Sequence, residues 1–162
     1  MTVLAVIPAR YASTRFPGKP LAPIAGRPMV LHVWERAMRA KTVDGVIVAT
    51  DDDRIAAVCR ENNVDVEMTR DDHVTGTDRL AELATRRTAD IYVNVQGDEP
   101  LIDPNAIDTC VDCLKDALNR KIEVGTVYLE NATDEQQASP SCVQLVPSVD
   151  GCVLTFSRLP VP

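Results

Sequence analysis

Long hydrophobic segments are absent from this sequence: no apolar run approaches the ~20 residues that a membrane-spanning helix needs. The pattern of a secretory signal is also absent, because the apolar residues at positions 2–7 lead directly into a loop. Basic residues are not in excess: 17 Lys and Arg face 24 Asp and Glu, which gives a net charge of -7. We therefore expect a cytoplasmic protein that has no membrane span and does not bind nucleic acid.

The chain has five cysteines, an odd number, so they cannot all form disulfide bonds with one another. Without an export signal we expect them to be reduced. Cys110 and Cys113 form a C-x-x-C, but they share an apolar helical stripe with Leu114 and Leu118. A zinc or redox site would need a second pair, a nearby His or a loop before the helix, so packing in the core is the better interpretation.

Acidic residues are absent from the first 34 positions, so every charged side chain before Glu35 is basic. Three of these cations, Arg10, Arg15 and Lys19, lie in a loop of small residues that follows the apolar run 3–7. Backbone N–H groups in such a loop approach an anion closely, and fixed cations hold several phosphate oxygens. The loop predicts a nucleoside triphosphate site at the carboxyl end of the first strand; the alternative is a surface loop with solvated cations.

The apolar periodicity predicts an α/β fold with a mostly parallel, doubly wound sheet. The segments 3–7, 46–49 and 91–95 are expected as central strands, with a short or edge strand over 64–68 and a further strand over 124–129. Helices are expected over 29–40, after 53, around 80–84 and over 103–118. A polar stretch over 130–140 predicts an exposed loop, and the turn residues 148–151 predict a C-terminal β-hairpin.

Carboxylates follow two of the predicted strands. For the run 51–53 we favour helix capping and a solvated turn over a metal site, because consecutive residues do not converge on one point. Asp98 comes after Gly97, which frees the backbone behind the third central strand. Mg²⁺ takes few protein carboxylates and fills its other positions with water and phosphate oxygens, so Asp98 is the predicted ligand. From G-D-E-P alone, a plain turn is an equal alternative.

The polar loop 69–79 also has two interpretations. Its hydroxyls, Arg70 and Gly76 lie at a predicted helix start, where they could cradle a base or a phosphate. The alternative is a capping loop with Thr75 or Thr77 as N-cap. The local pattern does not decide between the two.

The common phosphate-binding motifs are missing: neither G-x-x-x-x-G-K-[ST] nor G-x-G-x-x-G after the first strand occurs. Instead, the segment PARYASTRFPGKPL at 8–21 resembles the signature of the cytidylyltransferases that activate acidic sugars, most closely the CMP-Kdo synthetase family. The segments MTRDDHVTGTDR at 68–79 and NVQGDEPLI at 94–102 resemble the same family. The resemblance implies a Rossmann-like nucleotidyltransferase fold, with residues 1–162 as a single nucleotide-binding α/β domain and the N-terminal part of a longer enzyme.

The resemblance also implies a reaction, in which CMP from CTP is coupled to the acidic sugar Kdo (3-deoxy-manno-octulosonate) and pyrophosphate is released, for lipopolysaccharide synthesis. The implied catalytic residues are Arg15 and Lys19, the cofactor is Mg²⁺ on Asp98, and the full-length enzyme is expected to be a homodimer. The implied nucleotide-binding residues are Ala9, Arg10, Ser13, Arg15, Lys19, Arg70, Asp72, Thr75 and Gln96.

Two positions depart from the family pattern. Thr75 replaces the usual Ser but keeps the hydroxyl, whereas Gln144 replaces the usual Lys and loses a charge. Two alternatives to Kdo activation therefore stay open. One is the same chemistry on another acidic sugar of the sialic acid or amino-Kdo type. The other is a CTP-binding fragment without catalysis.

Overall fold

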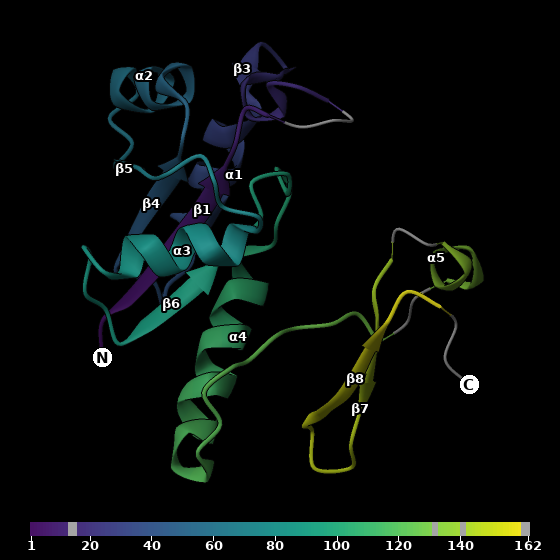
Figure 1. The fold of residues 1–162 in the computed structure, drawn as a ribbon. Coiled ribbons are helices and arrows are strands. Elements are labelled where there is room, and N and C mark those ends of the chain that lie inside the picture. Colours follow the sequence, from purple (N-terminus) through teal and green to yellow (C-terminus); the bar gives the residue numbers. More distant parts are fainter. Residues whose placement is uncertain (13–15, 131–132, 140–141, 160–162) are drawn as a thin grey trace. The chain divides into compact units, whose positions relative to one another are not determined.

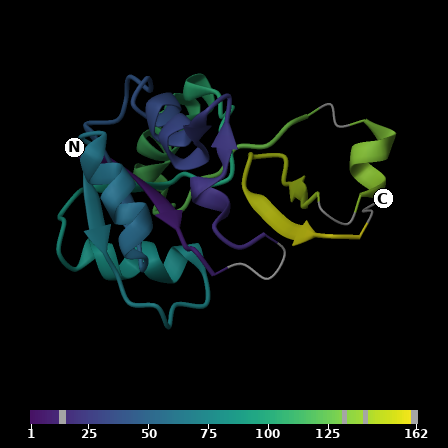
Figure 2. The same cartoon turned by 90° about the horizontal axis from the view of Figure 1, so that it is seen from above.

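A computed structural model describes residues 1–12, 16–130, 133–139 and 142–159. The predicted candidates Ser13 and Arg15 lie outside these residues. The chain forms two compact units, Met1–Gly125 and Thr126–Pro162, shown in Figure 1 and, from above, in Figure 2. Within the described residues, no helix has the length and apolar character needed to cross a membrane.

A parallel four-stranded sheet forms the centre of the first unit. Its strands are β1 (Val3–Ala9), β4 (Gly45–Thr50), β5 (Val66–Met68) and β6 (Ile91–Asn94), in the order β5-β4-β1-β6. The chain builds the sheet outward from β1 through β4 to β5, and then returns to add β6 on the other side of β1. In open α/β sheets, ligands bind at the carboxyl ends of the strands where the strand order reverses, here between β1 and β6.

The helices cover both faces of this sheet, which confirms the predicted doubly wound fold (Figure 1). Buried residues of α1 (Met29–Ala37), α2 (Asp53–Glu61) and α4 (Pro104–Ala117) form one core cluster on the first face. On the opposite face, α3 (Gly76–Ala84) packs through Leu83. Shorter elements connect these parts: η1 (Lys19–Leu21), β2 (Pro23–Ile24), β3 (Arg27–Pro28) and η2 (Leu118–Arg120).

The alternation along β1 explains why its sequence is apolar without interruption. Ala5, Ile7 and Ala9 contribute to the cluster under α1 and α2, while Val6 lies in the cluster under α3. All four are at most 2% exposed. A strand that is buried on both faces has no position for a polar side chain, so its hydrophobic run is continuous.

The second unit contains the predicted hairpin, with β7 (Gln144–Pro147) antiparallel to β8 (Val153–Ser157). Its tight turn ends at Gly151, whose φ of 81° is readily adopted only by glycine. Two details of the prediction were wrong. Residues 124–129 form no strand, because no described strand pairs with them. The polar stretch 130–140 contains a short helix, α5 (Asp134–Ala138), and a capping box is present at its N-terminus.

Leu83→Ala tests the packing of α3. Leu83 is fully buried against the sheet, so the truncation removes transfer free energy and leaves a cavity. We expect the free energy of unfolding in urea to fall by about 2–5 kcal/mol. The control is Leu101→Ala, because Leu101 is 86% exposed and should change stability by less than about 0.5 kcal/mol. Equal losses in the two variants would contradict the burial of this helix face.

Candidate functional site

A pocket of about 490 Å³ opens at the carboxyl ends of the strands, where the strand order reverses. Its volume lies in the range of small-molecule sites. Three segments form it: the end of β1 with the loop that follows, the start of α3, and the loop after β6. The lining residues are Pro8, Ala9, Arg10, Phe16, Lys19, Pro20, His73, Val74, Thr75, Gly76, Arg79, Gln96, Gly97 and Asp98.

Two glycines bring these segments together around Pro8. A Cβ atom on Gly97 would lie 2.6 Å from the carbonyl oxygen of Pro8, and one on Gly76 would lie 2.9 Å from Cγ of the Pro8 ring. Both distances are shorter than van der Waals contact allows. The absence of a side chain at these two positions therefore sets how closely α3 and the loop after β6 approach the end of β1.

Lys19 and Asp98 carry opposite charges into the pocket. Lys19 Nζ lies 2.7 Å from Asp98 Oδ2, although the two residues are 79 positions apart. A hydrogen bond from the Gly18 N–H to the Tyr11 carbonyl, at 2.8 Å, closes the loop that carries Lys19. Gly18 adopts the left-handed conformation. Both charged side chains are partly exposed, 37% for Lys19 and 53% for Asp98, so a ligand can reach them.

Most of the predicted residues that the structure describes line this pocket. Ala9, Arg10 and Lys19 come from the first loop, Thr75 from the start of α3, and Gln96 and Asp98 from the loop after β6. Arg70 and Asp72 do not line it. They form an ion pair, Nε to Oδ1 at 3.3 Å, and border a neighbouring cavity that shares His73 and Val74 with the first.

Thr75 is the N-cap of α3, which is one of the two roles that the sequence left open, and it also lines the pocket. Its hydroxyl accepts from the Asp78 N–H at 3.1 Å, and the Asp78 carboxylate accepts from the Thr75 N–H at 2.9 Å. The Thr75 hydroxyl and N–H also lower the pKa of Asp78 below its ordinary value. In the run 51–53, Asp52 caps α2, as the preferred interpretation predicted.

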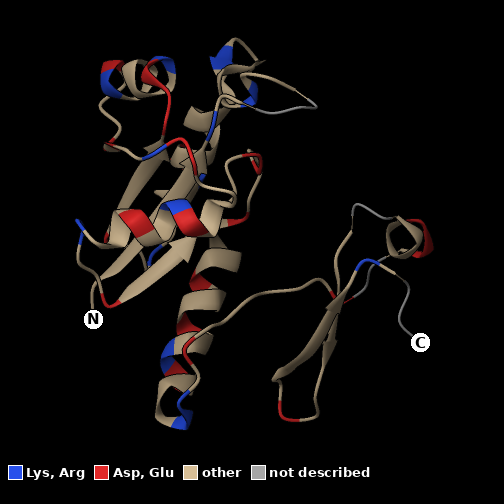
Figure 3. Ribbon diagram, viewed as in Figure 1, with Lys and Arg blue, Asp and Glu red and all other residues tan. Residues whose placement is uncertain are grey.

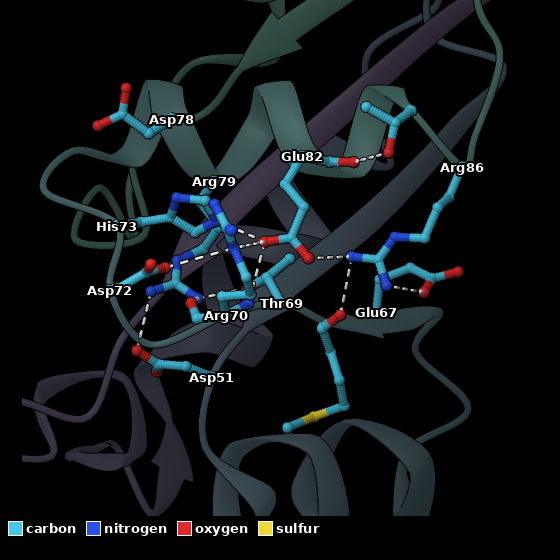
Figure 4. A network of polar contacts seen from close by, with 12 residues as sticks. Asp51, Glu67, Thr69, Arg70, Asp72, His73, Asp78, Arg79, Glu82 and Arg86 are labelled. Atoms are coloured by element: carbon cyan, nitrogen blue, oxygen red, sulfur yellow. Dashed lines mark hydrogen bonds and ion pairs between the residues drawn. The ribbon is translucent and has the colours of Figure 1, made fainter.

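A network of charged residues that reaches the pocket wall through His73 and Arg79 was not predicted (Figure 4). Arg79, only 3% exposed, donates to Asp51 Oδ2 at 2.8 Å. One turn along α3, Glu82 accepts from the Arg70 N–H at 3.0 Å and from Arg86 at 2.8 Å. Basic and acidic residues thus alternate along α3 (Figure 3). The sequence contains these residues within the quoted segments or near them, but apart from Glu82 and Arg86, which are four positions apart, nothing in it indicates which charges pair.

The Glu82 carboxylate is the acceptor at the centre of this network. Its partial burial raises its pKa, but the Arg70 N–H, the His73 ring and the Arg86 charge outweigh burial and lower the pKa below the ordinary value. His73 Nε2 lies within hydrogen-bonding distance of Glu82 Oε2. Because an ionised carboxylate only accepts, Nε2 carries the hydrogen and donates it.

The described residues contain no cluster of three His, Cys, Asp or Glu side chains that could hold a metal ion by themselves. Asp98 is a single carboxylate at the mouth of a pocket that also holds cations. This donor set fits Mg²⁺ that takes its remaining ligands from phosphate oxygens and water. It does not fit a metal bound tightly by protein alone.

Comparisons with known proteins agree with this geometry. The model of the cytidylyltransferase family matches residues 4–162, so the chain belongs to this family. The 3-deoxy-manno-octulosonate cytidylyltransferase of Geobacter sulfurreducens is 54% identical over the whole chain, and that of Pseudomonas syringae is 49% identical over 97% of it. The chain spans 64% and 62% of the lengths of these two relatives.

Solved structures show the same similarity. A CMP:2-keto-3-deoxy-manno-octonic acid synthetase complexed with CTP matches with a TM-score of 0.89 and 40% identity, over 100% of this chain and 66% of that one. A cytidylyltransferase from Leptospira borgpetersenii matches with a TM-score of 0.66 and 31% identity, over 74% of this chain and 51% of that one. The family predicted from the sequence is thereby confirmed.

Gly97→Ala tests the close packing at Pro8. The added Cβ would meet the Pro8 carbonyl oxygen, which is backbone and cannot rotate away, so one of the two segments must shift. We expect about 1–3 kcal/mol of lost stability in urea unfolding, the usual effect of overpacking. Gly125→Ala is the control, because its Cβ would find ordinary contacts beginning at 3.5 Å. A Gly97 variant as stable as this control would refute the steric role of Gly97.

Proposed function

We propose that the pocket binds CTP, and that the whole protein couples CMP to the acidic sugar Kdo with release of pyrophosphate. The observation that carries the proposal is the pairing of Lys19 with Asp98 where the strand order reverses, because a phosphate-binding cation and a metal-binding carboxylate are needed side by side in nucleotidyl transfer. The similarity to a synthetase complexed with CTP and to curated Kdo cytidylyltransferases supports the choice of substrates.

In the proposed reaction a hydroxyl group of the sugar attacks the α-phosphate of CTP, and pyrophosphate leaves. Negative charge grows on the non-bridging and leaving oxygens, so the protein has to position the reactants and stabilise charge, and it needs no nucleophile of its own. We assign Arg10 and Lys19 to the triphosphate. Ser13 and Arg15, outside the described residues, are assigned to it from the sequence, with Arg15 and Lys19 as the catalytic pair.

Asp98 is the proposed ligand of Mg²⁺, which when bound would neutralise charge on the phosphate oxygens. Lys19 Nζ lies 2.7 Å from this carboxylate. A bound triphosphate would give Lys19 a further anionic partner beside Asp98, and Asp98 would hold the divalent cation.

The nucleoside is assigned to the walls of the pocket formed by Ala9, Thr75 and Gln96, with Arg70 and Asp72 at the edge of the neighbouring cavity. The Gln96 side chain offers an amide donor and an acceptor that can read a base edge. Because the curated relatives are longer, we propose that residues 1–162 form the nucleotide-binding part of a longer enzyme. Its cytoplasmic location and homodimeric state are proposed from the family resemblance.

Lys19→Ala tests the phosphate assignment. Loss of the charge should slow pyrophosphate release from CTP in the presence of Kdo and Mg²⁺ by about 10²–10³-fold, the usual effect of removing one transition-state contact. Lys115→Ala, in the last turn of α4, is the control for loss of a charge away from the pocket. A Lys19 variant that turned over at the wild-type rate would remove this loop from phosphate binding.

Asp98→Asn tests the metal assignment. The amide keeps the size of the side chain but removes its charge, so we expect the Mg²⁺ concentration needed for half-maximal pyrophosphate release to rise about tenfold or more. The control is Asp112→Asn on the exposed side of α4. An unchanged Mg²⁺ titration would exclude Asp98 as the ligand. Calorimetric binding of CTP by a wild-type chain without turnover would identify these residues as a binding unit that lacks catalysis.

A further inference from the structure

The loop between β5 and α3, residues 69–75, supplies one wall of the pocket. His73, Val74 and Thr75 all line it, and the first turn of α3 follows directly. Val74 is 81% exposed and has little packing of its own. A loop of this kind keeps one shape only if its ends and its backbone are tied to the surrounding structure.

The start of the loop is tied by Arg79. This buried guanidinium donates to the Thr69 hydroxyl, to the Arg70 carbonyl at 3.2 Å and to Asp51 Oδ2 at 2.8 Å. Thr69 continues the pairing of the sheet, since its N–H donates to the Thr50 carbonyl at 2.8 Å. The first two residues of the loop are therefore fixed to the end of β4 and to Arg79 of α3.

The middle of the loop is tied by Glu82, three residues after Arg79 and on the same side of α3. Its Oε2 accepts from the Arg70 N–H at 3.0 Å and from the His73 ring, while its Oε1 accepts from Arg86 at 2.8 Å (Figure 4). The His73 side chain is only 7% exposed. Glu82 borders the neighbouring cavity with His73, but it does not line the nucleotide pocket itself.

We propose that Glu82 is a positioning residue, which fixes His73 and the loop 69–75 as a preformed wall on the nucleoside side of the pocket. The proposal rests on the function proposed above, because it assigns this wall to the nucleoside. Glu82 acts only through the groups that it holds, namely the Arg70 N–H and the His73 ring. A preformed wall spares the ligand the entropy of ordering the loop, so nucleotide affinity depends on Glu82 without any contact to it.

The cations of the first loop are not involved in this role. Arg10 and Lys19 reach the pocket from the segment after β1, and neither has a described hydrogen bond to the loop 69–75. Loss of Glu82 should therefore weaken binding of the nucleoside part and leave phosphate binding intact. This selectivity separates a positioning role from a general loss of structure.

The test compares Glu82→Gln with Glu67→Gln. The wild-type carboxylates of Glu82 and Glu67 are about equally exposed, 21% and 23%. Each accepts from an Arg side chain just beyond the end of α3, Arg86 for Glu82 and Arg87 for Glu67. Glu67 Oε1 accepts from Arg87 at 2.7 Å, but Glu67 contributes to neither cavity. The two substitutions thus remove the same charge from the same region, and only one of them touches the loop.

Two measurements distinguish the variants. We expect the dissociation constant of CTP, measured by calorimetry, to rise roughly tenfold in Glu82→Gln and less than twofold in Glu67→Gln. The dissociation constant of tripolyphosphate should change less than twofold in both. In the ligand-free proteins, amide hydrogen exchange over residues 70–75 should accelerate in Glu82→Gln alone, because the Arg70 N–H loses a charged acceptor.

Each outcome has a definite meaning. Wild-type affinity for CTP in Glu82→Gln, or an equal loss in Glu67→Gln, would overturn the proposal. Equal weakening of CTP and tripolyphosphate would also overturn it, since this would indicate a general disturbance of the pocket. If the wild-type protein bound no CTP at all, the proposed function would fail. Hydrogen exchange would then still decide about the loop: unchanged exchange in Glu82→Gln would refute the positioning role as well.

Discussion

The pocket depends on a close approach of backbone around Pro8. Gly76 and Gly97 leave no side chain between this residue and two segments that lie about 70 and 90 positions further along the chain. The reversal of strand order leaves space beyond the carboxyl ends of β1 and β6, and the two glycines determine how narrow that space becomes. Cations, carboxylate and helix start are all placed relative to this contact.

Two kinds of ion pair surround the pocket, and they differ in burial. The pair of Lys19 and Asp98 is partly exposed, so it contributes little to stability and can be exchanged for ligands. The pair of Arg79 and Asp51 is buried, and loss of one partner would leave an uncompensated charge in the interior. The accessible pair therefore lies where ligands are proposed to bind, whereas the buried pair fixes Arg79 within the wall of the pocket.

The sequence predicted those features that depend on local pattern. β1 and β4 were found because strands buried on both faces have continuous apolar runs. β6 was found from its apolar residues 91–93, but it lies at the edge of the described sheet and not at its centre. Residues 124–129 have a similar apolar character but no partner strand among the described residues, and apolar character alone does not make a strand. α5 was missed although Thr133 and Gln136 form a capping box, because the surrounding residues are polar and show no apolar stripe.

The candidate site was predictable to the extent that its residues lie in the segments that follow strands. Arg10, Lys19 and Asp98 follow this rule. The pairs that Arg79 and Glu82 form were not predictable in this way, since Arg79 and Asp51 are 28 residues apart and one helix contains charges that point to different neighbours. From the sequence alone, several acidic and basic side chains could pair equally well, and the packing of the folded chain determines which pairs form.

The assembly of the pocket from distant segments has a thermodynamic consequence. β1 pairs with β6 across 88 residues, as Leu4 and Tyr92 show, so the pocket does not exist in a partly folded chain that lacks this pairing. A ligand that fills the pocket binds the folded first unit and not the unfolded chain. By mass action, a ligand at one hundred times its dissociation constant adds about 2.7 kcal/mol to the folding free energy of that unit. Ligand binding at the site and unfolding of the first unit are thus thermodynamically linked equilibria.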